Sequence, residues 1–136
     1  MSRRSLLLLF SGILVAMLAV TAWASSEVAL WSLPRELVAH PWFIATLFDA
    51  YWAFITFYVW MAWKEQSLAA RLLWFLAVIA LGNIAMAVYM LVELFRVPAV
   101  GPAGEALHTV FTRRNPGCLA LPAVFVVVSA VIYLLA

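Results

Sequence analysis

The chain has 136 residues, of which 68% are hydrophobic and 10% are charged, and its formal net charge is +2. Soluble domains are about 45 to 50% apolar and about 25% charged, so a soluble fold of this size cannot bury so much apolar surface. The small, scattered positive charge excludes a nucleic-acid surface. The sequence therefore predicts a single membrane domain, residues 1–136, whose solvent is the lipid bilayer.

Four apolar segments are long enough to cross a bilayer, which takes about 20 residues of helix. Because lipid offers the backbone no hydrogen-bond partners, each segment is expected to be helical. We predict an all-α membrane protein with four transmembrane helices, near residues 5–24, 42–63, 72–95 and 118–136.

The first segment also matches a cleavable signal peptide. Arg3 and Arg4 precede the apolar run, and small residues around Ala24 follow it, as at a cleavage site. Gly12 and Ala16 form part of a small-residue stripe suited to helix packing. We therefore expect this helix to be retained, with cleavage as the alternative.

Three connections join the predicted spans. Residues 64–71 form a polar turn short enough to make the second and third helices a central antiparallel hairpin. The first connection, residues 25–40, is expected to hold a short interfacial helix. In the third connection Leu107, Val110 and Phe111 recur at helical spacing, which predicts a second interfacial helix around them.

The orientation depends on which side of the membrane carries the Lys and Arg residues. Four spans divide them equally, with Arg3, Arg4, Lys64 and Arg71 on one side and Arg35, Arg96, Arg113 and Arg114 on the other. Charges next to the first helix usually dominate, so we expect the N- and C-termini in the cytoplasm. The expected location is the bacterial inner membrane.

Asp49 lies seven residues inside the second predicted span. A carboxylate at such a depth is costly and marks a function or a buried partner. Asn83 falls within one turn of the same depth in an antiparallel hairpin, and its amide can donate to the carboxylate. We expect an intramembrane polar pair between them. The alternatives are a proton or ion relay and a contact with a partner subunit or cofactor.

The second predicted span is rich in aromatic residues, and those at its ends are expected to lie at the membrane interface. Rings inside the span are expected to pack against lipid or neighbouring helices. No cofactor is predicted, and contact with a carotenoid, quinone or chlorin is the alternative. The residues suggested for partner or cofactor contact are Tyr51, Trp52, Tyr58 and the interfacial His40. The predicted interface anchors are Trp42, Trp60, Trp63, Arg113 and Arg114.

No group of residues has the pattern of a catalytic or metal site. Glu65 and Glu93 lie at predicted helix ends, where Lys64 and Arg96 can pair with them, and a solvated interface is expected there. Cys118 is the single cysteine and has no ligand cluster near it. We therefore predict that the protein is not an enzyme and holds no metal.

A resemblance covers the central part of the chain. The residues that carry it are Pro41-Trp42, Ala45-Thr46-Leu47, Asp49, Tyr51, Lys64-Glu65, Leu73-Trp74, Gly82, Tyr89 and Leu94-Phe95. In this order they resemble a domain-of-unknown-function family of small integral membrane proteins found in plants and bacteria. The resemblance implies the hairpin and carries no activity to transfer.

Small size, aromatic helix faces and the lack of a catalytic pattern suggest a non-catalytic accessory or scaffold subunit. Its expected partners are the lipid bilayer and other membrane subunits, as in a photosynthetic or respiratory complex. The alternative is a small transporter or a proton- or ion-conducting protein centred on Asp49, with Tyr51 and Asn83 tuning it. A membrane enzyme acting on lipid or isoprenoid fits least well.

Overall fold

The protein was analysed as a computed structural model, which describes residues 2–98 and 103–135. In these two ranges all regular elements are helical, which confirms the all-α fold class. The elements are α1 (Arg3–Glu27), the 3-10 turn η1 (Leu30–Ser32), α2 (Arg35–Val38), α3 (Pro41–Lys64), α4 (Leu68–Leu81), α5 (Asn83–Phe95), α6 (Ala103–Thr112) and α7 (Ala120–Leu135).

Two of the described helices, α1 and α3, are long and apolar enough to cross a membrane. They contain 25 and 24 residues, which gives lengths of roughly 36 to 38 Å against an apolar bilayer core of about 30 Å. α3 begins where His40 accepts a hydrogen bond from the backbone nitrogen of Trp42 at 3.3 Å, with Pro41 at the first helical position. The first two predicted spans are thus long helices.

The predicted third span, residues 72–95, is wrong because the chain folds back at Gly82. α4 and α5 contain 14 and 13 residues, about 20 Å each, so neither is long enough to cross the bilayer. The rings of Trp74 and Tyr89 lie on opposite sides of this break, and their centroids are only 5.0 Å apart. In a continuous helix they would be separated by roughly 22 Å. α4 and α5 therefore form a helical hairpin with arms of about 20 Å each.

Gly82 permits this turn for two reasons. Its φ of +50° and ψ of −123° lie in a region that residues with a Cβ rarely adopt. A Cβ at this position would also lie 2.6 Å from Cζ of the Phe54 ring on α3. The backbone at the tip of the hairpin therefore packs directly against the aromatic ring.

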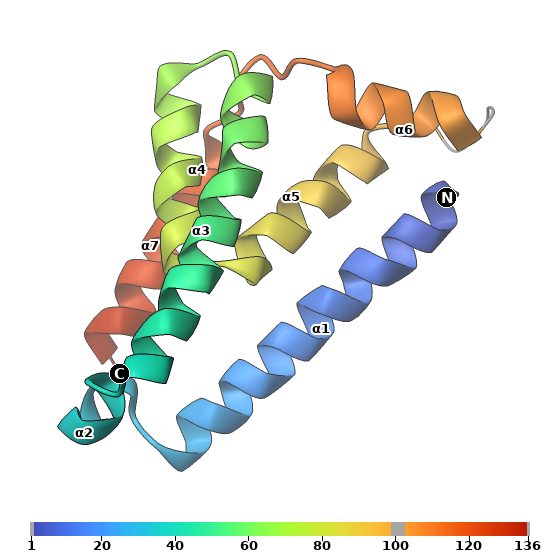
Figure 1. The fold of residues 1–136 in the computed structure, drawn as a ribbon. Coiled ribbons are helices and arrows are strands. Elements are labelled where there is room, and N and C mark those ends of the chain that lie inside the picture. Colours follow the sequence, from blue (N-terminus) through green and yellow to red (C-terminus); the bar gives the residue numbers. More distant parts are fainter. Residues whose placement is uncertain (1, 99–102, 136) are drawn as a thin grey trace.

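The helices form two groups, which Figure 1 shows side by side. α3, α4 and α7 make one group, and α1 runs antiparallel to α5 in the other. α6 lies across one end of the molecule and confirms the helix predicted in the third connection, although residues 99–102 lie outside the described ranges. In the first connection α2 spans only four residues. The last predicted segment, 118–136, forms the 16-residue α7.

The hairpin also changes the distribution of charge. Seven of the eight Lys and Arg lie at the end of the molecule that carries α6, namely Arg3, Arg4, Lys64, Arg71, Arg96, Arg113 and Arg114. Only Arg35 on α2 lies at the other end. The equal division expected from the sequence required a continuous third span and is therefore wrong.

The two ends of the chain lie at opposite ends of the molecule, not at the same end as expected (Figure 1). Near the N-terminus, Arg3 Nε donates to the carbonyl oxygen of Leu94 at the end of α5. Near the C-terminus, the ring of Tyr133 lies 6.0 Å from that of Trp31, in the connection between α1 and α3. We call the end that carries α6 the cationic end.

Replacing Gly82 by Ala is expected to destabilise the hairpin. The positive φ alone costs about 1 to 3 kcal/mol, and the contact with the Phe54 ring adds to this. Thermal unfolding in detergent measures the loss. Gly12→Ala is the matched control, because a Cβ there meets no atom within 4 Å and Ala favours a helix interior. Equal stability of the two variants would contradict the packing at Gly82.

Candidate functional site

A cluster of buried polar side chains lies at the cationic end. It forms where the C-terminal ends of α3 and α5 meet the connection between α6 and α7. Each member is at most 3% exposed, and the members are Lys64, Glu65, Tyr89, Glu93 and Asn115. The solvated interface expected at these helix ends is therefore wrong.

The strongest electrostatic contact in the cluster joins Lys64 of α3 to Glu93 of α5. Lys64 Nζ lies 2.7 Å from Glu93 Oε2, and both side chains are fully buried. Among the described residues Glu93 Oε2 accepts no hydrogen bond, so its contact with Lys64 is an ion pair without hydrogen-bond geometry. Lys64 Nζ instead donates to the carbonyl oxygen of Val110 on α6. Arg96 donates to Glu93 Oε1 at 2.9 Å, and an Arg113 nitrogen lies 3.7 Å from Oε2. Glu93 is thus surrounded by three cations.

Asn115 connects the two carboxylates. Its amide nitrogen donates to Glu65 Oε1 at 2.8 Å and to Glu93 Oε1 at 3.0 Å. Its backbone nitrogen donates to the carbonyl oxygen of Lys64 at 2.8 Å, and its own carbonyl accepts from Gln66 at 3.0 Å. The connection between α6 and α7 is therefore held against the end of α3 by both backbone and side-chain bonds.

The close approach of this connection requires a second glycine. Gly117 has a φ of +93°, and a Cβ there would lie 2.4 Å from Cβ of Ser67. Ser67 caps α4 by accepting a hydrogen bond from the backbone nitrogen of Ala70. A side chain at residue 117 would separate the connection from the turn between α3 and α4.

Tyr89 closes the cluster on the side of the apolar core. Its hydroxyl donates to Glu65 Oε1 at 2.9 Å, and its ring packs edge-on against Trp74 and Trp60. Burial raises the pKa of the phenol well above its usual value, and the carboxylates of Glu65 and Glu93 raise it further. Tyr89 is therefore a neutral hydrogen-bond donor to Glu65.

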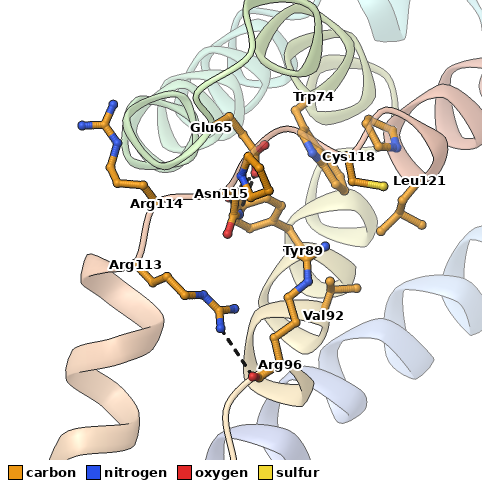
Figure 2. A pocket seen from close by; sticks show the side chains of 12 residues that line it. Glu65, Trp74, Tyr89, Val92, Arg96, Arg113, Arg114, Asn115, Cys118 and Leu121 are labelled. Carbon is orange, nitrogen blue, oxygen red and sulfur yellow. Dashed lines mark hydrogen bonds between the residues drawn. The ribbon is translucent and has the colours of Figure 1, made fainter.

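A cavity of about 480 Å³ lies beside this cluster. Figure 2 shows its lining, which combines members of the cluster with arginines and with apolar side chains of α4, α5 and α7. The lining residues are Glu65, Trp74, Tyr89, Val92, Arg96, Arg113, Arg114, Asn115, Pro116, Cys118, Leu121 and Pro122.

Chemically, the cluster is suited to holding helices together and to binding an anion at its cationic rim. The polar hydrogens of Asn115 and Tyr89 are donated to carboxylates of the cluster itself. Over residues 2–98 and 103–135, no group of three or more His, Cys, Asp or Glu side chains is placed to hold a metal ion.

The predicted pair of Asp49 and Asn83 is not formed within this chain. Both side chains are exposed, and the described contacts include no hydrogen bond between them. Asn83 begins α5, which turns away from α3, whereas the prediction had placed it on a continuous helix beside α3. Asp49 therefore lies on the outer surface of α3.

The residues suggested for partner or cofactor contact do not form a common site. Tyr51 and Trp52 are exposed on α3, and the Tyr58 hydroxyl donates to the carbonyl oxygen of Arg71 at 2.9 Å. His40 caps α3 through Nδ1. None of the four lines the cavity.

The predicted interface anchors fall into two groups. Trp42 is largely exposed, as expected for an anchor. Trp60 instead donates to the carbonyl oxygen of Phe111, and the ring of Trp63 stacks with the Arg114 guanidinium at 5.1 Å. Arg113 belongs to the rim of the buried cluster. Four of the five predicted anchors therefore make contacts within the chain.

Sequence reasoning missed the cluster because its members come from separate parts of the chain. One signal was present: the Gly82-Asn83 dipeptide, a common turn element, lies at the middle of a long apolar stretch. That stretch is flanked by Lys64-Glu65 on one side and by Glu93 on the other. A hairpin brings these flanking charges together, whereas a straight helix separates them.

Comparison with known families gave one result. A family model described as "Protein of unknown function (DUF1475)" matches residues 6–136, which is nearly the whole chain. This confirms the resemblance to a family of unknown function and extends it beyond the central segment. No curated protein and no solved structure is significantly similar to the chain.

Removing one member of the Lys64–Glu93 pair is expected to be strongly destabilising. Lys64→Met leaves Glu93 with less compensation, at a cost of about 3 to 5 kcal/mol in unfolding free energy. Adding Glu93→Gln removes the uncompensated charge and should restore part of the stability. Unfolding in mixed detergent micelles measures both variants, with the exposed Arg4→Met as control. Glu93→Gln alone completes the comparison, and if the loss in the double variant equals the sum of the two single losses, the two charges do not interact.

Proposed function

Because the chain belongs to the family of unknown function DUF1475, which has no activity to transfer, we propose a function from geometry alone. The protein is a non-catalytic accessory subunit of a larger membrane assembly, and it docks through the outer face of α3. The observation that carries this proposal is the position of Asp49.

Asp49 is the ninth residue of α3, about 12 Å from the start of the helix. At this depth a carboxylate is costly in lipid and almost always faces protein or a water-filled cavity. Its side chain is exposed on the surface of this chain, and it does not line the cavity. A polar group from a second membrane protein would cover it, which supports docking at this face.

The surroundings of Asp49 on α3 are suited to helix packing. Ala45 and Ala53 lie one turn before and after it and are exposed, so a partner helix can approach the backbone closely. Trp52 and Trp42 flank these positions and are largely exposed. Small residues with large aromatic rings beside them are typical of an interface that combines close contact with broad apolar burial.

The polar groups at the other end of α3 support a structural role. The carboxylates of Glu65 and Glu93 are engaged by donors or cations of the same chain. Neither is paired with a nucleophile or placed as a free general base. The cluster thus fixes the hairpin and the connection before α7, which gives α3 a rigid support for docking.

We also infer the topology of the chain in the membrane. α1 and α3 cross the bilayer, the α4–α5 hairpin enters it from the cationic end and returns, and α7 then crosses from the cationic end to the opposite side. Backbone at such a break is tolerated in a membrane where protein covers it, as Phe54 covers Gly82. Seven of the eight Lys and Arg lie at the cationic end, which favours the cytoplasm for that end and for the N-terminus. The C-terminus then lies across the membrane, unlike the arrangement expected from the sequence.

Cysteine labelling of a Cys118-free variant tests this topology. Single cysteines at Ser2 and Gln66 should react only from the cytoplasm, and one at Glu36 should react only from the opposite side. A C-terminal reporter should be active on the side of Glu36. Reporter activity on the same side as Ser2 would support the topology with a continuous third span. It would contradict the proposed hairpin in the membrane.

Docking at Asp49 can be tested with a photo-crosslinking residue at Ala53. In native membranes we expect a discrete protein adduct, and Val15 on α1, which is also exposed, is the control position. Asp49→Leu should weaken the adduct, because a membrane hydrogen bond contributes about 0.6 to 2 kcal/mol, whereas Asp49→Asn should retain it. A crosslinking yield that is unchanged by both substitutions would contradict the proposal. Ion flux in vesicles that requires Asp49 would favour the conducting alternative instead.

A further inference from the structure

The cavity beside the buried cluster has two chemically different walls. Its polar wall carries the guanidinium groups of Arg96 and Arg113. Its apolar wall consists of Trp74 on α4, Val92 on α5, and Leu121 with Pro122 at the start of α7. At about 480 Å³ it is in the size range of small-molecule sites.

Both guanidinium groups of the polar wall are partly exposed. Arg113 is 34% exposed; one of its terminal nitrogens donates to the carbonyl oxygen of Arg96 at 3.4 Å, and the other is buried 3.7 Å from Glu93 Oε2. Arg96 donates to Glu93 with one nitrogen and is 42% exposed. Figure 2 shows both side chains extending along the cavity, while the Arg114 guanidinium points away from it. Two partly exposed guanidinium groups therefore face this wall, each with one terminal nitrogen already directed at Glu93.

The charge balance favours an anion in spite of the nearby acids. Glu65 accepts from Tyr89 and Asn115, and Glu93 is paired with Lys64 and Arg96. The charged residues that line the cavity are Arg96, Arg113 and Arg114 against the single carboxylate of Glu65. The excess of positive charge lies on the side of the arginines.

The position of the cavity matches the level of lipid headgroups. It lies at the cationic end, beside the C-terminal end of α3, and its apolar wall is formed by Trp74 in the middle of α4 and by the start of α7. Guanidinium groups bind phosphate through two parallel hydrogen bonds, and apolar side chains accommodate an acyl chain.

We propose that this cavity binds one anionic phospholipid, with its phosphate on Arg96 and Arg113 and part of an acyl chain against Trp74, Val92 and Leu121. The site is separate from the outer face of α3, so it does not rest on the docking proposed above. A bound lipid would add contacts between α5 and α7 at the cavity.

The test uses the full chain in a nonionic detergent, titrated separately with phosphatidylglycerol, phosphatidylcholine and inorganic phosphate. Native mass spectrometry counts bound lipid, and the thermal unfolding midpoint reports stabilisation. We expect one phosphatidylglycerol to remain bound and to raise the midpoint. Arg113→Gln should weaken this binding about fivefold, as expected for one cation near a headgroup, whereas Arg35→Gln at the other end should not.

A second pair of variants tests the apolar wall without changing charge. Val92→Trp fills the cavity and should abolish lipid binding, whereas Val127→Trp on the exposed face of α7 should leave it intact. Equal retention of phosphatidylcholine would overturn the proposal, because the headgroup charge would then be irrelevant. Equal stabilisation by inorganic phosphate would also overturn it, in favour of a free-anion site. Binding that is unchanged in both Arg113→Gln and Val92→Trp would place the lipid elsewhere.

Discussion

The fold depends on the buried ion pair between Lys64 and Glu93. It joins the end of α3 to the end of α5, two segments that a straight third span would place on opposite sides of the membrane. Two charges buried in an apolar interior are costly unless they are paired and their other polar atoms are engaged. Asn115 and Arg96 provide much of that engagement. The pair therefore specifies one arrangement of the hairpin and excludes the extended one.

The steric constraint at Gly82 acts together with this ion pair. The ion pair closes the open end of the hairpin, while the contact of Gly82 with Phe54 fixes its tip against α3. Between these two points Trp74 and Tyr89 pack edge-on in the apolar core. Tyr89 connects the core to the polar cluster because its ring belongs to one and its hydroxyl to the other. Packing and electrostatics thus select the same conformation at both ends of α4 and α5.

This arrangement separates the molecule into regions with different physical properties. The cationic end has buried polar side chains and carries seven of the eight Lys and Arg. The middle of α3 presents Asp49 on its outer surface, far from the buried cluster. The cavity has a mixed lining, with arginines on one wall and apolar residues on the other, and it lies beside α5 and α7. The proposed docking face and the proposed lipid site therefore lie on separate surfaces.

The sequence predicted the features that depend on local composition. The long helices α1 and α3 and the short α6 follow from apolar runs and helical spacing, and α1 and α3 are long and apolar enough to cross a membrane. Membership in a family of unknown function was also visible from motifs between Pro41 and Phe95. These predictions succeed because hydrophobicity and periodicity are properties of neighbouring residues.

Only the tertiary structure decided the direction of the chain after Gly82, and with it the charge distribution and the site. An apolar stretch of residues 68–95 satisfies a lipid environment either as one helix or as two half-helices, so hydropathy cannot distinguish them. The choice depends on contacts between distant residues, Lys64 with Glu93 and Gly82 with Phe54. Those contacts turned Asn83 away from Asp49, gathered the arginines at one end, and buried carboxylates that the sequence alone placed in water.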